Sequence, residues 1–218
     1  MKVVISLGGS ILSPEDVTFI HNVSSLLKKA SKDMTLYIVT GGGKFARAYI
    51  NAARYFTHNE KKLDRIGILA TKMNALLLAT ALDCPHQVPS TIDKAMQATN
   101  SIVMGGTIPG QSTDAVGATL ALRLNADKFI IATDVNGVYT DDPKTHHQAK
   151  KYDIIHIDKL IKLCNKKWQA GLNVIIDKKA CKIIKKGNIK TIVLNGKDLK
   201  SLENALYDKQ FDGTIIEV

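Results

Sequence analysis

Three short apolar segments each run into a cluster of glycines, and this recurring arrangement limits the possible folds more than any other feature of the chain. The segments are Val3–Leu7 before Gly8-Gly9-Ser10, Leu36–Thr40 before Gly41-Gly42-Gly43, and Ser101–Met104 before Gly105-Gly106. Short, continuous apolar runs bounded by glycine predict strands that are buried on both faces. Such strands are typical of parallel sheets whose two faces are covered by helices.

The stretches between these strands have the spacing of helices. Residues 15–30, for example, place Val17, Ile20, Val23 and Leu27 along one stripe. The same patterns predict helices at 44–55, 64–82, 113–126, 178–186 and 198–207, and further strands at Phe129–Thr133, Thr191–Leu194 and Thr214–Val218. We therefore expect an α/β fold, a three-layer αβα sandwich with a mostly parallel central sheet. It should form a single domain over residues 1–218, with 1–125 holding one substrate and 126–218 the other.

The composition is that of a globular chain with an excess of positive charge. The net charge is +10, and residues 150–190 hold 12 Lys against three Asp. This stretch contains one Trp and one Tyr and no aromatic stacking pattern, so a solvated lysine face is favoured over a nucleic-acid surface. The excess charge also helps to attract anionic substrates. We expect no nucleic-acid partner.

Neither a membrane segment nor a cysteine framework is predicted. No apolar run approaches the ~20 residues that a membrane helix needs. The three cysteines, Cys84, Cys164 and Cys181, are scattered without a C-x-x-C pair, so they suggest neither a disulfide framework nor a zinc site. We expect a cytoplasmic protein with no membrane partner.

The glycine turns are candidate phosphate-binding sites. Glycine lets the backbone approach a ligand closely, and a helix that begins just beyond offers free N–H groups to an anion. Any one turn could equally be a plain tight turn, but three at strand ends favour phosphate binding. The chain has no P-loop motif and no dinucleotide-binding fingerprint.

Two cations, Lys44 and Arg47, follow the second glycine turn. Arg47 should lie one turn into the next helix and face the glycines, where a guanidinium can hold phosphate oxygens in bidentate fashion. The dipole disfavours a cation at the start of a helix unless an anion is bound. A binding role is therefore favoured over a plain surface position.

Two polar loops are candidates for recognising a nucleoside. The loop Thr107–Asp114 is dense in hydroxyl and amide groups, and Ser112 or Thr113 suits the N-cap of the following helix. The segment Ala132–Tyr139, followed by Asp141-Asp142-Pro143, leaves a strand end with a Tyr and a carboxylate pair, which suits an adenine-ribose pocket. A capped loop and an acidic turn without a ligand are the alternative interpretations.

Taken together, these segments resemble the amino acid kinase superfamily, and within it the uridylate kinases of archaeal type. The matching stretches, in chain order, are Leu7–Ser10, Thr40–Arg47, Met104–Thr107, Pro109–Val116, Ala132–Tyr139 with Asp142-Pro143, Lys190–Gly196 and Gly213–Glu217. Each stretch is modestly specific, whereas the ordered set over the whole chain is highly specific.

The resemblance implies transfer of the γ-phosphoryl group of ATP to UMP, giving UDP and ADP, in pyrimidine nucleotide biosynthesis. It assigns the ATP side to Gly9, Ser10, Gly43, Arg47, Thr133, Tyr139 and Asp142. It assigns the UMP side to Gly42, Asp64, Thr107, Ile108, Pro109, Gly110, Gln111, Ser112 and Thr113. The candidates for catalysis are Arg47, Lys44 and Asp177. Asp64 is expected to open the third helix and to bond the ribose hydroxyls.

The resemblance also implies a cofactor and an assembly. Mg²⁺ is expected as the cofactor, without a dedicated set of metal-ligating residues, and the expected assembly is a homohexamer built from dimers. Phosphoryl transfer depends on alignment and charge neutralisation, so no histidine base is required.

The chain departs from the family pattern at three places. Many members carry a Lys just before the first glycine turn, where this chain has Ser6, so the missing charge must come from Lys44, Arg47 or Mg²⁺. Asn136 stands where Asp is usual. Asp177-Lys178-Lys179-Ala180 stands where Asp-Pro-Leu-Ala is expected. Asp177 either positions Mg²⁺ or the donor phosphates or serves as a helix N-cap.

Other functions stay open on the sequence alone. The acceptor could be carbamate, an acyl amino acid or isopentenyl phosphate, although the last favours a His near the second glycine turn, where this chain has none before His58. A non-catalytic nucleotide-binding regulator would explain the absence of the first-strand Lys. A nucleic-acid-binding protein is suggested by net charge alone.

Overall fold

The central sheet has the predicted, mostly parallel arrangement. A computed structural model describes residues 1–84, 88–164 and 176–218, which form a seven-stranded sheet in the order β3-β2-β1-β4-β6-β7-β5. The strands are β1 (Lys2–Leu7), β2 (Thr35–Thr40), β3 (Ile102–Met104), β4 (Lys128–Thr133), β5 (Ile154–His156), β6 (Thr191–Asn195) and β7 (Thr214–Glu217). Every neighbouring pair is parallel except β6 and β7.

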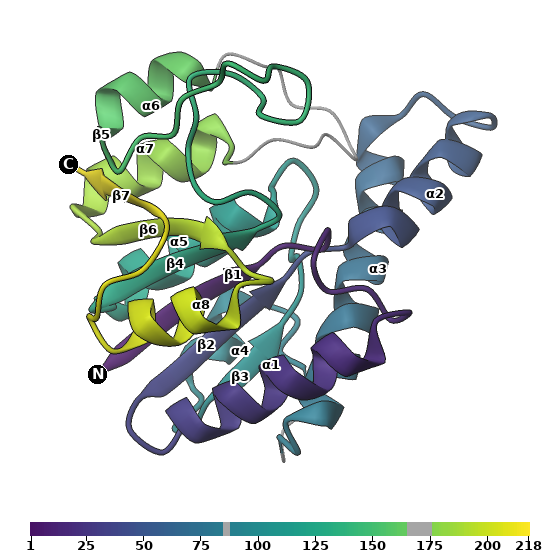
Figure 1. The fold of residues 1–218 in the computed structure, drawn as a ribbon. Coiled ribbons are helices and arrows are strands. Elements are labelled where there is room, and N and C mark those ends of the chain that lie inside the picture. The colour runs from purple at the N-terminus through teal and green to yellow at the C-terminus, as the bar shows by residue number, and fades with distance from the viewer. Residues whose placement is uncertain (85–87, 165–175) are drawn as a thin grey trace.

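Helices cover both faces of the sheet, which confirms the three-layer prediction (Figure 1). They are α1 (Val17–Ala30), α2 (Gly43–Arg54), α3 (Glu60–Ala81), α4 (Ile92–Met96), α5 (Thr113–Leu124), α6 (Ile157–Leu163), α7 (Lys178–Gly187) and α8 (Leu199–Leu206). Helices α1 and α8 lie on one face, while α5 and α7 lie on the other.

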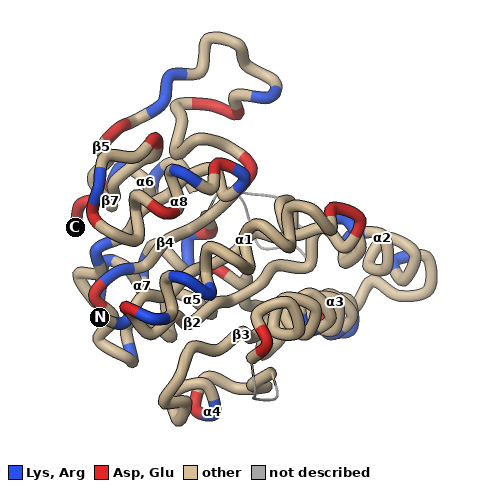
Figure 2. The backbone as a smooth tube through the Cα atoms, turned by 60° about the horizontal axis from the view of Figure 1, so that its bottom comes forward, with Lys and Arg blue, Asp and Glu red and all other residues tan. Residues whose placement is uncertain are grey.

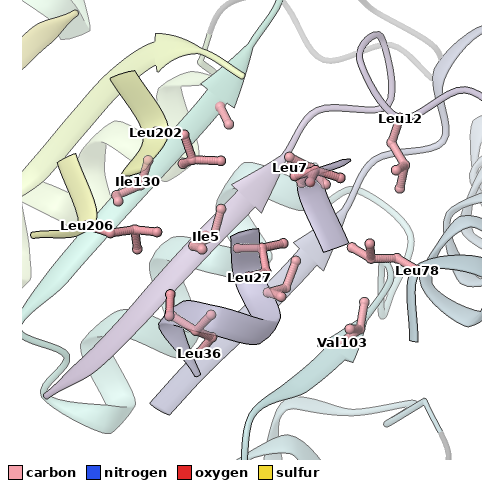
Figure 3. Close-up of a cluster of buried hydrophobic side chains, with 14 of the residues drawn as sticks. Ile5, Leu7, Leu12, Leu27, Leu36, Leu78, Val103, Ile130, Leu202 and Leu206 are labelled. Carbon is pink, nitrogen blue, oxygen red and sulfur yellow. The ribbon is translucent and has the colours of Figure 1, made fainter. Parts of the chain in front are cut away.

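The side chains of β1 alternate between two hydrophobic clusters. Ile5 and Leu7 lie in the same cluster as Leu27 of α1 and Leu206 of α8 (Figure 3), and all four are buried. Val4 belongs to the cluster on the opposite face, with residues of α5 and α7. Because both faces of β1 are covered, its sequence is a continuous apolar run rather than an alternation of apolar and polar residues.

Lysines in the C-terminal half of the chain form ion pairs with acidic residues. Lys185 pairs with Asp158 at 2.5 Å, and Lys190 pairs with Asp208 at 2.8 Å. Figure 2 shows acidic segments among the basic ones along the tube, including the long loop before β5. This distribution fits the solvated lysine face that the sequence favours.

Helix α3 begins four residues earlier than predicted. The Asn59 side chain caps it by accepting a hydrogen bond from the Lys62 N–H at 3.3 Å. The prediction that Asp64 opens this helix is therefore wrong. Asp64 lies in the second turn, on the buried side of α3.

Three short elements were not predicted: α4, β5 and α6. They have five, three and seven residues, too few for an apolar period to be recognised. Strand β5 exists through its parallel pairing with β7, about sixty residues later in the chain. Such a distant contact leaves no local pattern in the sequence.

The first two glycine turns touch through their backbones. A Cβ atom on Gly9 would lie 2.1 Å from the backbone nitrogen of Gly43 and 2.6 Å from the carbonyl carbon of Gly41. Gly43 also has a φ of +62°, a backbone conformation that is strained for residues with a side chain. The two turns are therefore so close that only glycine fits at position 9.

We expect the variant Gly9→Ala to lower the free energy of unfolding by at least about 2 kcal/mol, because the atoms that meet its methyl group are backbone atoms that cannot rotate away. Gly67→Ala in α3 is the control, since its Cβ would meet only the Ile50 side chain and alanine favours the helix by ~1 kcal/mol. Urea unfolding followed by circular dichroism compares the two. Equal losses of stability would contradict the close backbone contact.

Candidate functional site

Two adjoining cavities lie at the carboxyl ends of the strands, where open α/β sheets bind their ligands. The smaller has a volume of about 190 Å³ and the larger about 730 Å³. Thr133, at the end of β4, lines both. Strand order reverses between β1 and β4, so the site lies at the switch point of the sheet.

The glycine turns and the starts of two helices form the smaller cavity. Its walls include Gly9, Ser10, Gly42, Gly43 and Arg47. Helix α2 begins at Gly43, so its first backbone N–H groups lack partners within the helix. This arrangement suits a phosphate, because free N–H groups and a guanidinium converge on one small space.

The structure separates the two cations that follow the second glycine turn. Arg47 lines the smaller cavity. Lys44 lines neither cavity; it forms an ion pair with Glu15, and its side chain is 56% exposed. Its Nζ also lies 5.4 Å from the ring centre of Phe45.

Polar side chains of α3 hold the glycine turns in place. The Asn74 side-chain amide donates to the Gly41 carbonyl oxygen at 2.8 Å. The Thr71 hydroxyl accepts from the Gly106 N–H at 2.7 Å and donates to the Ile68 carbonyl oxygen at 2.6 Å. The sequence interpretation missed both residues, although buried polar residues on the apolar stripe of a helix were a usable signal.

Asp64 and the loop before α5, which the resemblance assigns to the UMP side, are in contact. The Asp64 Oδ2 accepts a hydrogen bond from the Gly110 N–H at 2.6 Å. Within the predicted acceptor set, Gly42, Asp64, Gln111, Ser112 and Thr113 line the smaller cavity and Gly110 lines the larger. Thr107, Ile108 and Pro109 line neither. Ser112 caps α5 by accepting from the Ala115 N–H at 3.0 Å, so the N-cap prediction is confirmed.

The larger cavity brings together the residues expected on the adenosine side. Thr133, Tyr139 and Asp142 all line it, as does Asp177. Two further acidic residues, Asp134 and Asp141, also line it. The lining includes these apolar and basic side chains as well: Val135, Val138, Leu160, Leu163, Ile176, Lys144, Lys178, Lys179 and Lys182. An apolar wall beside several cations suits a flat aromatic base carrying a chain of phosphates.

Asp177 performs the capping role that the sequence left open. Its Oδ1 accepts from the N–H groups of Lys179 at 2.7 Å and Ala180 at 3.1 Å, at the start of α7. Its other oxygen accepts from the Ser112 hydroxyl. Asp177 thereby connects the start of α7 to the start of α5, between the two cavities.

A second hydroxyl–carboxylate pair joins β1 to the start of α5. Ser6, which is 1% exposed, donates to the Asp114 Oδ1 at 2.5 Å. Burial raises the pKa of Asp114 to about 7, the Asp177 charge adds to this rise, and the Ser6 hydrogen bond opposes it. The sequence interpretation did not single out Asp114, because an acidic residue in the first turn of a helix is common.

Comparison with known proteins identifies the family. The sequence model of the Amino acid kinase family matches residues 1–195. The chain belongs to this family. It is 42% identical over 225 residues to the uridylate kinase of Thermococcus sibiricus, with 100% of both chains covered. It is 43% identical over 226 residues to that of Methanococcus vannielii, with 99% of each covered.

Solved structures agree with this assignment. The crystal structure of uridylate kinase from Archaeoglobus fulgidus matches at a TM-score of 0.88 and 39% identity, covering 99% of this chain and 100% of that one. UMP kinase from Ureaplasma parvum has the same fold, at a TM-score of 0.80 and 24% identity, with 100% of this chain and 99% of that one covered. The resemblance to the archaeal uridylate kinases is confirmed.

The described residues contain neither a candidate membrane-spanning helix nor a cluster of candidate metal ligands. Within 1–84, 88–164 and 176–218, no helix is both long and apolar enough to cross a membrane. In the same ranges, no group of three or more His, Cys, Asp or Glu side chains is arranged to hold a metal ion.

Replacing Asp114 with Asn should change how stability depends on pH. Since the folded protein raises the pKa of Asp114 from its ordinary value near 4 to about 7, the folded state binds this proton more tightly than the unfolded chain does. The carboxyl group therefore costs stability increasingly as the pH rises between those values. We therefore compare the free energy of unfolding of Asp114→Asn with that of the wild type at pH 5 and at pH 8. The difference should shift in favour of Asp114→Asn by about 1–3 kcal/mol from the lower to the higher pH.

Urea titrations at the two pH values measure this difference. Asp141→Asn, on an exposed loop, is the matched control, and its difference from the wild type should stay constant. If the stability difference between Asp114→Asn and the wild type were also constant with pH, this would contradict the raised pKa of Asp114.

Proposed function

We propose that this protein is a uridylate kinase, which transfers the γ-phosphoryl group of ATP to UMP and releases UDP and ADP. One observation carries the proposal: a cavity suited to a nucleotide base adjoins a smaller cavity whose glycine turns suit a phosphate, and the two meet at Thr133. The full-length relatives of this chain are uridylate kinases. Two substrates whose phosphates must meet need such adjoining sites.

In this proposal the acceptor belongs to the N-terminal part of the chain, over residues 1–125, and the donor base to residues 126–218. The lining of the two cavities supports the division, because the glycine turns and α3 form most of the smaller one. The larger one is lined mainly by the loop after β4 and by α6 and α7. Asp64 and the loop Thr107–Thr113 would bind UMP, and Thr133, Tyr139 and Asp142 would line the adenosine side.

The reaction depends on alignment and charge neutralisation rather than on a base. A UMP phosphate oxygen forms the new bond to the γ-phosphorus while the bond to the β,γ-bridging oxygen breaks, and ADP leaves with the electron pair. Arg47 and the backbone N–H groups at Gly9, Ser10 and Gly43 would neutralise the charge on the transferred group. Lys178 and Lys179 would supply further positive charge from the start of α7.

Mg²⁺ fits the carboxylates present. Asp114 and Asp177 lie close enough to influence each other electrostatically, and Mg²⁺ usually takes one or two carboxylates together with substrate phosphates. Asp177, which lines the larger cavity, is the residue that would hold it. When bound, the ion neutralises phosphate charge.

We propose that the protein forms a homo-oligomer, specifically the homohexamer that the family resemblance implies. Exposed apolar side chains on α3 and at the end of α2 support an interface there: Leu69 (63%), Met73 (70%), Leu76 (60%), Tyr55 (89%) and Phe56 (84%). The free cysteines fit the reducing cytoplasm, where we expect the protein to act.

The acceptor assay separates the candidate functions. With ATP and Mg²⁺, the purified protein should convert UMP to UDP at least about 100-fold faster than it converts CMP, AMP, carbamate or isopentenyl phosphate, because Asp64 and the loop before α5 select the nucleoside. Anion-exchange chromatography of the products measures this. ATP binding without turnover of any acceptor would favour the non-catalytic regulator instead.

Arg47→Ala should reduce kcat by more than about tenfold, because it removes a cation that stabilises charge in the transition state. Arg123→Ala is the matched control: Arg123 pairs with Asp93 at 2.7 Å near the opposite end of α5. Its kcat should match that of the wild type. If Arg47→Ala also kept the wild-type kcat, Arg47 would have no role in the reaction.

A further inference from the structure

Two of the three cysteines lie side by side although they are 17 residues apart. The Sγ atoms of Cys164 and Cys181 are 3.8 Å from each other. Cys164 is the C-cap of α6, and Cys181 is the fourth residue of α7. Their contact therefore joins the ends of two helices that form one wall of the larger cavity.

The two thiols differ in their access to solvent. Cys164 is half-buried and lines the larger cavity, whereas Cys181 is 0% exposed. A small oxidant that enters the cavity therefore meets Cys164 first. Cys181 can react only through its neighbour.

The hydrogen bonding of the pair also favours reaction at Cys164. Donation from the Cys181 thiol lowers the pKa of Cys164, while the pKa of Cys181 is raised by the same contact and by burial. Burial and the Asp177 charge oppose this lowering of the pKa of Cys164, and Lys178 adds a smaller lowering effect. The thiolate is the reactive form of cysteine, so these contacts give the accessible sulfur the greater reactivity.

We propose that Cys164 and Cys181 form a reversible intramolecular disulfide when the protein meets a peroxide, and that this bond weakens nucleotide binding in the larger cavity. The Cys164 thiolate attacks the peroxide and becomes a sulfenic acid as the O–O bond breaks. The Cys181 thiol then displaces the hydroxyl group as water. Overall, the two thiols lose two electrons and two protons, and hydrogen peroxide is reduced to two molecules of water.

Bond formation changes the lining of the larger cavity at Cys164. The sulfurs must approach from 3.8 Å to about 2.05 Å, so the Cys164 side chain, which lines the cavity, turns toward α7. Leu160 and Leu163 of α6 line the same cavity as Cys164, and Asp177 lines it directly before α7. The second half of the proposal, on nucleotide affinity, rests on the proposed function, whereas the disulfide itself does not.

Cys84 provides an internal comparison within the chain. It is half-buried like Cys164, but it packs against the cluster that contains α1 and α8, whereas Cys164 and Cys181 belong to the cluster on the other face of the sheet. Its sulfur donates to the Ser101 carbonyl oxygen at 4.0 Å. Within residues 1–84, 88–164 and 176–218, Cys84 makes no contact with either of the other two cysteines.

The full-length protein treated with hydrogen peroxide tests the disulfide directly. Intact mass and peptide mapping should show loss of two hydrogens and a Cys164–Cys181 cross-link, in the wild type and in Cys84→Ser alike, and dithiothreitol should reverse it. Cys181→Ala should instead accumulate a sulfenic acid on Cys164, trapped by dimedone. A cross-link between chains, or none in Cys84→Ser, would overturn the proposal.

Titration calorimetry with ATP tests the consequence without requiring turnover. The oxidised wild type should bind ATP at least about threefold more weakly than the reduced protein, while oxidised Cys181→Ala, which lacks the cross-link, should change less than twofold. UMP affinity should be equal in both forms of the wild type. A complete disulfide with unchanged ATP affinity would overturn the regulatory half. Failure of the reduced protein to make UDP would count against the proposed function alone.

Discussion

The contact between two glycine turns is the constraint on which the rest of the site depends. Gly9 and Gly43 meet backbone to backbone, at distances that leave no room for a Cβ atom. This contact brings the carboxyl ends of β1 and β2 together and orients the start of α2 toward the smaller cavity. The Asn74 amide, bonded to Gly41, then secures α3 against the same turn. A phosphate-binding surface made of backbone N–H groups follows from this packing rather than from any single side chain.

Local patterns predicted the fold where the elements are long and buried. The apolar run of β1 and the stripe on α1 exist because both pack against the central core, so their periods reflect burial directly. The start of α3 was misplaced because its cap, Asn59, lies in a polar stretch without an apolar period. The short β5 depends on its pairing with β7, which is a contact across the chain and leaves no trace in local sequence.

The sequence could predict those site residues whose role follows from their residue type and from their place just after a strand. Arg47 belongs to this group and lines the smaller cavity. Asp64 lines the same cavity, but only the family resemblance singled it out. Lys44 shows the limit of that reasoning, since its ion pair with Glu15 is formed across a loop. Asp114 is a further case: its sequence position does not single it out, and it is mainly its burial in the fold that raises the pKa of its carboxyl group.

The two cavities share the wall at Thr133, and this has a consequence for inhibitor chemistry. On the proposed assignment of UMP and ATP to these cavities, a compound that joins two nucleosides through a phosphate chain would occupy both spaces as a single molecule. Such a ligand loses its translational freedom once rather than twice, so its affinity exceeds what either half achieves separately. The length of the linking chain would then report the distance between the two bound nucleosides.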